Sequence, residues 1–229
     1  MFVKICGITN EDDALLATAL DADALGFIFA PSKRQMHPEA VRDIVRRLPR
    51  EILTFGVFRD EAPERIVEIL TRTGLHGAQL HGRESPADVE YVRDRVQIVI
   101  QAFAAGDAAL AKAAESRADI ILVDSPDPGS GKVFDWRLAE GAPSGIRMLL
   151  AGGLTPENVG DAIRLVRPWG VDVSTGVEES PGRKDARKLR EFVQAARAAG
   201  LEVADRSIDL TLSDDIAGVT RPWDWQLDE

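Results

Sequence analysis

Eight short apolar runs alternate with amphipathic helical segments along residues 1–200, and this alternation limits the possible folds more than any other feature of the chain. Strands that alternate with helices form parallel βαβ units with right-handed crossovers. Eight such units favour a sheet that closes on itself, so the sequence predicts a (β/α)8 TIM barrel. The predicted strands are residues 2–6, 24–29, 52–58, 77–80, 96–103, 120–124, 146–151 and 171–175. The predicted helices are residues 12–20, 38–48, 63–72, 86–93, 107–116, 135–140, 156–166 and 185–199.

The structural alternative to a barrel is an open, doubly wound parallel sheet. Such a sheet usually carries a glycine-rich dinucleotide-binding turn after its first strand. Here that turn, residues 6–10, reads CGITN and does not match G-x-G-x-x-G. We therefore expect the closed barrel.

Residues 201–229 depart from the alternating pattern. They contain eight acidic residues and two arginines, a net charge of −6, which leaves −4 for residues 1–200. Acidic composition favours disorder, whereas Trp223 and Trp225 favour an extended segment docked on the barrel or on a partner. We expect a catalytic barrel domain over residues 1–200 and an acidic C-terminal extension over residues 201–229.

Charge and composition argue against several kinds of partner. The formal net charge of −10 disfavours nucleic-acid binding. No apolar stretch approaches the roughly 18–20 residues of a membrane span and no signal segment is apparent, so we expect a cytoplasmic protein without a membrane partner. One cysteine and three histidines show no metal-ligand spacing, which predicts no metal site. An anionic ligand would have to be held by local backbone N–H groups and a few basic side chains.

Cys6 is the first candidate for chemistry, because function in such barrels sits at the carboxyl ends of the strands. Strand alternation puts Lys4 and Cys6 on the face opposite Val3 and Ile5. If the latter two pack under the helices, Cys6 lies at the barrel mouth above an ammonium group that favours its thiolate. A thiolate there can remove a proton from carbon. The alternative is a buried apolar role for Cys6, and Lys4 can pair with Asp172 of the eighth strand.

Asp124 directly follows the apolar run 120–123. Pro126 and Pro128 come next, so no helix starts there and a capping role is weakened. Apolar surroundings favour the protonated form of a carboxyl group, which suits a general acid. The sequence thus predicts an acid–base pair, with Cys6 as base and Asp124 as acid.

Two glycine-containing loops follow the seventh and eighth predicted strands. Glycines let backbone N–H groups approach an anion, and Thr155 can cap a helix that starts at Pro156. Paired loops at these two places are a common phosphate site in such barrels, although each alone could be a tight turn. The predicted phosphate-binding residues are Gly152, Gly153, Ser174, Thr175 and Gly176.

The segment 129–132 reads GSGK but is not a phosphate-binding P-loop. Position 126 is proline where that motif has its first glycine, and position 133 is valine where it has serine or threonine. We expect this segment to form a mobile lid that pivots on its glycines.

Seven strings at the predicted strand ends carry a family resemblance. They are KICGIT at 4–9, ADALGFIF with SKR at 22–34, GVF at 56–58, AQLHG at 78–82, LVDS with GSGKVFDW at 122–136, AGGLTPENV at 151–159 and VDVSTGVEESPGRKD at 171–185. In this order, over residues 1–199, they resemble the phosphoribosylanthranilate isomerase family of tryptophan biosynthesis. The extension from 201 to 229 lies beyond the usual end of that family.

The resemblance implies an Amadori rearrangement of N-(5′-phosphoribosyl)anthranilate to 1-(2-carboxyphenylamino)-1-deoxyribulose 5-phosphate, without metal or cofactor. It implies that Asp124 protonates the furanose ring oxygen and that Cys6 removes the C2′ proton. By the same resemblance Arg34 holds the anthranilate carboxylate, the two glycine loops hold the phosphate, and the protein is a monomer or a homodimer. The pocket would also be lined by Gln79, His81 and Asp172.

Three other functions stay open on the residues alone. A lysine inside the barrel, Lys4, could form a Schiff base in an aldolase. A bifunctional isomerase that also serves histidine biosynthesis would be expected to carry aspartate in place of Cys6. A non-catalytic protein could bind a phosphorylated ligand and use its tail to recruit a partner.

Overall fold

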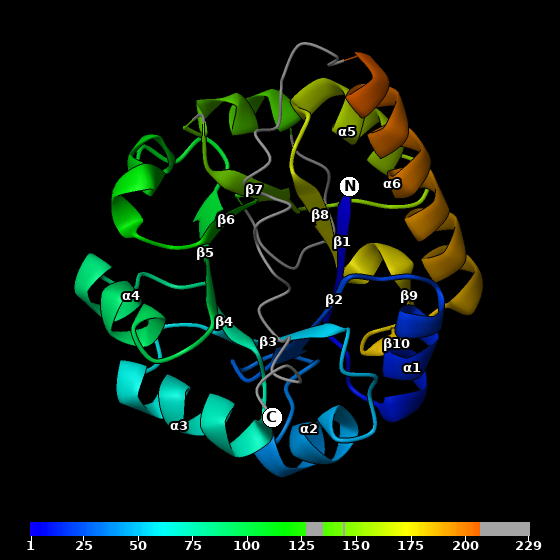
Figure 1. Cartoon of the computed structure of the whole chain (residues 1–229). Helices are drawn as coiled ribbons and strands as arrows, with labels where there is room; N and C mark the ends of the chain where they lie inside the picture. Colours follow the sequence, from blue (N-terminus) through cyan, green and yellow to red (C-terminus); the bar gives the residue numbers. More distant parts are fainter. Residues whose placement is uncertain (127–134, 144, 207–229) are drawn as a thin grey trace, which may run out of the picture.

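The computed structural model describes residues 1–126, 135–143 and 145–206, and it confirms the predicted (β/α)8 barrel. Eight parallel strands follow one another around the barrel in chain order, and the last pairs with the first (Figure 1). The predicted lid at 129–132 and residues 207–229 of the extension lie outside the described residues. The barrel strands are β1 Phe2–Cys6, β2 Ala24–Ile28, β3 Leu53–Phe58, β4 Gly77–Leu80, β5 Ile98–Ala104, β6 Ile120–Asp124, β7 Arg147–Leu150 and β8 Gly170–Val173.

Helices surround the barrel (Figure 1). The α-helices are α1 Glu11–Ala19, α2 Pro38–Val45, α3 Pro63–Thr73, α4 Pro86–Arg93, α5 Val159–Val166 and α6 Ala186–Arg206. Two of the predicted helices are instead short 3-10 helices, η1 Leu110–Ser116 and η2 Trp136–Gly141. A left-handed residue, Arg117, ends η1 after seven residues, which is long for a 3-10 helix because such runs seldom exceed about three or four residues.

The eighth strand was predicted to continue to residue 175, but it ends at Val173. A 3-10 turn, η3 Thr175–Val177, follows, and then a small hairpin of β9 Glu178–Ser180 and β10 Arg183–Lys184. The hairpin was not predicted, because its strands of three and two residues are too short to show alternation. It lies next to the carboxyl end of the barrel, where Glu178 contacts Arg34 and Lys184 contacts the carbonyl of Cys6.

Helix α6 begins near the predicted position but continues past residue 199 to Arg206. At Gly200 a Cβ atom would lie only 2.4 Å from the Cβ of Met1, so glycine is needed where the helix crosses the first residue of the chain. The helix therefore carries the chain out of the barrel without a break at residue 200. The division into a barrel and an extension stays a prediction.

The apolar residues form two cores, one on each side of the strands. The interior of the barrel is filled by Ala24, Phe55, Ile100, Ile120, Leu122, Leu149 and Ala151. The second core, between strands and helices, includes Val3 and Ile5 of β1. Strands buried on both faces are expected in a parallel barrel. Since Val3 and Ile5 pack outward, the predicted inward direction of Lys4 and Cys6 is confirmed.

Closure of the barrel aligns Lys4 of β1 with Asp172 of β8. Their side chains form a salt bridge, with 2.8 Å between Nζ and Oδ1, as the strand parity predicted. In the part of the chain that the structure describes, no helix has the length and apolar character needed to cross a membrane.

Candidate active site

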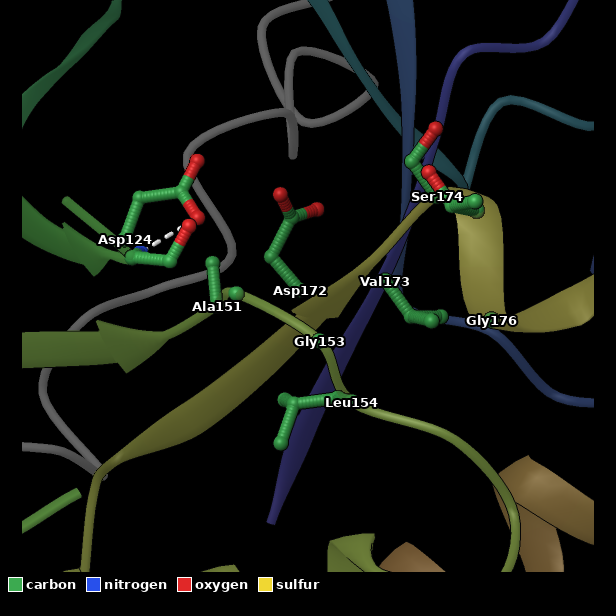
Figure 2. Close-up of a pocket in the computed structure, with 11 residues that line it drawn as sticks. Asp124, Ala151, Gly153, Leu154, Asp172, Val173, Ser174 and Gly176 are labelled. Carbon is green, nitrogen blue, oxygen red and sulfur yellow. Dashed lines mark hydrogen bonds between the residues drawn. The ribbon is translucent and has the colours of Figure 1, made fainter. Parts of the chain in front are cut away.

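A pocket opens at the carboxyl ends of β6, β7 and β8. Figure 2 shows the carboxylates of Asp124 and Asp172 rising from the ends of β6 and β8, beside the loop that contains Gly153. Asp124 and all five predicted phosphate-binding residues lie in this one pocket. Its lining consists of Asp124, Ser125, Ala151, Gly152, Gly153, Leu154, Asp172, Val173, Ser174, Thr175 and Gly176.

The loop after β7 is built on left-handed glycines. Gly152 and Gly153 have φ values of +83° and +66°, a backbone region that L side chains rarely adopt. Asn158 holds the loop closed, because its side chain accepts from the N–H of Thr155 at 2.8 Å and donates to the carbonyl of Gly153 at 2.9 Å. The helix was predicted to begin at Pro156 with a Thr155 cap, but it begins at Val159, because residues 155–158 form a turn first.

The loop after β8 packs directly against the loop after β7. A Cβ atom on Gly176 would lie 1.9 Å from the carbonyl oxygen of Leu154, so only glycine permits this contact. The hydroxyl Oγ of Ser174 is buried and has no hydrogen-bond partner among the described residues. Two adjoining loops with an unpaired hydroxyl suit an oxygen-rich anion such as a phosphate group.

Cys6 lies at the end of β1, where its Sγ and the Nζ of Lys4 both sit over Gly26 of β2. A Cβ atom on Gly26 would be 2.8 Å from Sγ and 3.1 Å from Nζ. Cys6 is buried and does not itself line the pocket; Asp172, the partner of Lys4, does. Cys6 thus lies behind the pocket wall, next to the lysine that pairs with the wall residue Asp172.

Burial raises the pKa of the Cys6 thiol above its ordinary value of 9.0. The positive charges of Lys4 and Lys184 act in the opposite direction, and Asp172 adds to the rise. The expectation that an ammonium beneath Cys6 favours its thiolate is therefore right for that one interaction but wrong for the net pKa, because desolvation of the thiolate is the larger effect.

Lys4 is completely buried, and its charge is held by two neighbours. Burial acts to lower its pKa, but the charges and hydrogen bonds of Asp172 and Cys6 outweigh that effect and raise it above 10.5. A Schiff-base lysine must lose its proton to attack a carbonyl group. The Lys4 ammonium in its ion pair argues against the aldolase alternative.

Asp124 is joined to the two predicted pocket residues of β4 and its loop. His81 Nε2 lies 3.3 Å from Asp124 Oδ2, and Gln79 Nε2 lies 3.0 Å from His81 Nδ1. If the Gln79 amide donates to Nδ1, the proton of neutral His81 is on Nε2 and faces the carboxylate. The other oxygen, Oδ1, accepts from the N–H of Ser125 at 2.7 Å. The chain of Gln79, His81 and Asp124 can therefore orient the carboxyl group.

Arg34 is held by a residue that the sequence did not single out. Its Nε and Nη2 donate to Glu178 Oε1 and Oε2 at 2.7 and 2.6 Å, and Nη2 lies 3.4 Å from Thr175 Oγ1. Neither bond to Glu178 uses Nη1. The paired guanidinium has its pKa raised by the hydrogen bonds to Glu178. Arg34 thus stands beside the loop after β8 with one edge occupied by protein.

Glu178 and Lys184 are the site residues that sequence reasoning missed. Lys184 Nζ lies 3.2 Å from Glu178 Oε1, and both side chains are buried. Burial acts to raise the pKa of Glu178, but Arg34 and Lys184 outweigh it and the pKa is lowered; burial lowers the pKa of Lys184. Both residues stand in the string VEESPGRKD, but a charged string after a strand is usually a solvated surface.

The fold and the site together define a (β/α)8-barrel enzyme with a pair of adjoining glycine loops after β7 and β8. The sequence model of a family described as N-(5′phosphoribosyl)anthranilate (PRA) isomerase matches residues 3–195. The chain belongs to this family. No group of three or more His, Cys, Asp or Glu side chains placed to hold a metal ion occurs in ranges 1–126, 135–143 and 145–206.

Individual relatives agree with the family assignment. An N-(5′-phosphoribosyl)anthranilate isomerase from Desulforudis audaxviator is 50% identical over 204 residues, which cover 86% of this chain and 98% of the relative. The crystal structure of phosphoribosyl anthranilate isomerase from Thermus thermophilus has a TM-score of 0.82 and 41% identity, covering 86% of this chain and 99% of that one. A second solved isomerase, in complex with reduced 1-(o-carboxyphenylamino)-1-deoxyribulose 5-phosphate, has a TM-score of 0.77 and 38% identity with the same coverage.

Proposed function

We propose that this protein converts N-(5′-phosphoribosyl)anthranilate to 1-(2-carboxyphenylamino)-1-deoxyribulose 5-phosphate, in the cytoplasm, as a step of tryptophan biosynthesis. The observation that carries the proposal is that Asp124 and the two packed glycine loops line one and the same pocket. Asp172 also lines this pocket, and it pairs with Lys4, which lies next to Cys6. Membership of the isomerase family supports the choice of substrate. The reaction is an isomerisation in which the ring C–O bond breaks and protons are relocated, so the protein has to supply only an acid and a base and no cofactor is used.

Asp124, in its acid form, is the proposed general acid. It donates a proton to the furanose ring oxygen while the C1′–O bond breaks and the anthranilate nitrogen forms a C1′=N bond. The product of this step is an open-chain protonated Schiff base. His81 and Gln79 support the step by fixing the direction of the carboxyl group, with His81 Nε2 at 3.3 Å from Asp124 Oδ2.

Cys6, in its thiolate form, is the proposed general base. It removes the C2′ proton, and the electron pair of that bond forms C1′=C2′ while the C1′=N electrons return to nitrogen. The resulting enolamine gains a proton at C1′ and loses the C2′ hydroxyl proton, which gives the ketone. Because burial raises the pKa of the Cys6 thiol, its thiolate is a stronger base. A smaller fraction of Cys6 is then in the thiolate form at a given pH.

Substrate binding is assigned to the two ends of the site. The backbone N–H groups of the loops at Gly152–Gly153 and 174–176 hold the phosphate, together with the unpaired Ser174 hydroxyl. Arg34 holds the anthranilate carboxylate through the guanidinium edge that Glu178 leaves free. Asp172 lines the pocket and carries the charge that balances Lys4.

The direct test is turnover of N-(5′-phosphoribosyl)anthranilate by the purified chain, followed by the change in anthranilate fluorescence. We expect saturable turnover without added metal. Borohydride added with substrate should leave no covalent adduct on a lysine of the chain, whereas a Schiff-base aldolase would be trapped as one. A protein that binds the reduced product analogue but turns nothing over would be a non-catalytic binder and would overturn the proposal.

The proposed partner is this small phosphorylated substrate alone, without nucleic acid or membrane. The state of assembly remains a choice between monomer and homodimer. Light scattering coupled to size-exclusion chromatography decides between the two.

A further inference from the structure

Lys184 of β10 places a buried ammonium group behind the site. It is only 4% exposed. Its Nζ donates to the carbonyl of Cys6 at 2.7 Å, to the carbonyl of Ser174 at 3.1 Å and to Glu178 Oε1 at 3.2 Å. An ammonium group has three donors, so all three are used. One side chain from outside the barrel thus forms hydrogen bonds to the backbone at the carboxyl ends of both β1 and β8.

Glu178 extends this contact to Arg34. One carboxylate binds Lys184 through Oε1 and the Arg34 guanidinium through both oxygens, at 2.7 and 2.6 Å. Two positive charges are balanced by one negative charge, which leaves one net positive charge beside the pocket. In a chain with a net charge of −10, this cluster is a local source of positive potential for an anion.

The lysine acts on the pocket through peptide groups. No cis peptide bond occurs in the described chain, so each N–H points away from the carbonyl of its own peptide unit. With Lys184 on the carbonyl of Ser174, the N–H of Thr175 points away from the lysine, and Thr175 lines the pocket. A cation on the carbonyl polarises the whole unit and makes the N–H a stronger donor.

We propose that Lys184 is a positioning residue for the site: through the Cys6 and Ser174 carbonyls it fixes the base-bearing end of β1 against the phosphate loop after β8 and strengthens that loop's N–H donors. The inference rests on the proposed function in assigning the base to Cys6 and the phosphate to this loop. It adds a residue that does not touch the substrate, and it gives Glu178 the separate task of holding Arg34.

Lys184→Met tests the proposal by the binding of inorganic phosphate, measured by titration calorimetry. Loss of the cation and of its polarised donors should raise the Kd for phosphate about 10- to 100-fold. Lys188→Met is the matched control, because it removes the same charge nearby, where Nζ donates at 2.8 Å to the backbone carbonyl of Glu178. The control should bind phosphate as the unchanged protein does.

A second readout is the pH titration of Cys6, which a merely structural lysine would not move. The charged groups that act on Cys6 are Lys4 of its own strand, Asp172 of β8, Lys184 of β10 and Arg34 from the loop after β2. Removing one cation disfavours the thiolate, so Lys184→Met should shift the titration of Cys6 to higher pH. Lys188→Met should leave the titration in place.

Two further variants keep the test decisive. Lys184→Gln retains N–H donors for the carbonyls without the charge, so it serves if Lys184→Met does not fold, and it should also weaken phosphate binding and shift the titration. Glu178→Gln weakens the bonds that hold Arg34 but keeps Lys184 in place. It should therefore weaken the binding of the reduced product analogue and leave the Kd for phosphate unchanged. Equal behaviour of the Lys184 and Lys188 variants overturns the inference, as does a Glu178→Gln protein that loses phosphate as Lys184→Met does. None of these readouts needs turnover, so they stand apart from the test of the reaction.

Discussion

Removal of one partner from the ion pair between Lys4 and Asp172 should strongly destabilise the barrel, because the other charge is left buried and unpaired. Lys4 is completely buried, and its Nζ lies 2.8 Å from Oδ1 of an aspartate that is 8% exposed. Asp172→Asn keeps the shape of the side chain but leaves the ammonium without a counter-charge. Removing one partner of a buried pair costs about 3–5 kcal/mol of unfolding free energy. In a protein of this size, that corresponds to a Tm lower by roughly 6–20 °C.

Thermal melts followed by circular dichroism, with urea unfolding as a check on the free energy, measure this effect. The control is Glu68→Gln, which removes a partner from the Arg65–Glu68 pair, whose side chains are 44% and 58% exposed. Water screens that pair, so the Tm of the Glu68→Gln variant should equal that of the unchanged protein. The double variant Lys4→Met with Asp172→Asn also removes the unpaired ammonium group. It should therefore recover most of the Tm and unfolding free energy that Asp172→Asn loses. A single variant as stable as the control, or a double variant no better than the single, would refute the reasoning.

Four further results are expected. Cys6→Ala and Asp124→Asn should each lower kcat by about 10²- to 10⁴-fold in the fluorescence assay while the reduced product analogue still binds; near-normal turnover in Cys6→Ala would sink the mechanism. Arg34→Ala should mainly raise KM, by about 10- to 100-fold, because it removes a charge-assisted contact to the substrate; an unchanged KM with a lower kcat would contradict its assignment. Burial raises the pKa of the one cysteine, so the midpoint of its thiolate absorbance titration should lie above pH 9.0, and a midpoint near neutral pH would count against the desolvation argument. Truncation after Arg206, which keeps helix α6 whole, should leave kcat and Tm unchanged if the extension is an accessory.

The inward direction of Lys4 and Cys6 could be predicted because it depends on local sequence. A strand alternates its side chains with a period of two, so Val3 and Ile5 on one face place Lys4 and Cys6 on the other. The positions of Asp124 and of the glycine loops were predictable for a related reason. Each directly follows an apolar strand, and all strands of a parallel barrel end on the same side.

Arg34 shows where sequence reasoning stops. Its partner Glu178 lies 144 positions away along the chain, and Lys184 contacts the carbonyl of Cys6 across 178 positions. No periodic pattern connects such residues. The hairpin of β9 and β10 brings them together, and its strands are too short to leave a signal in the sequence.

Three features follow from the amino-acid sequence alone: the alternation of eight strands and helices, the side of the barrel that carries the site, and the residues that stand at the strand ends. Local periodicity is sufficient for these features, because each depends on neighbours a few residues apart. The net direction of the Cys6 pKa shift and the pairing of Arg34, Glu178 and Lys184 depend on the folded arrangement of distant segments. Desolvation and ion pairing depend on which distant segments exclude water from a group, and packing alone determines that.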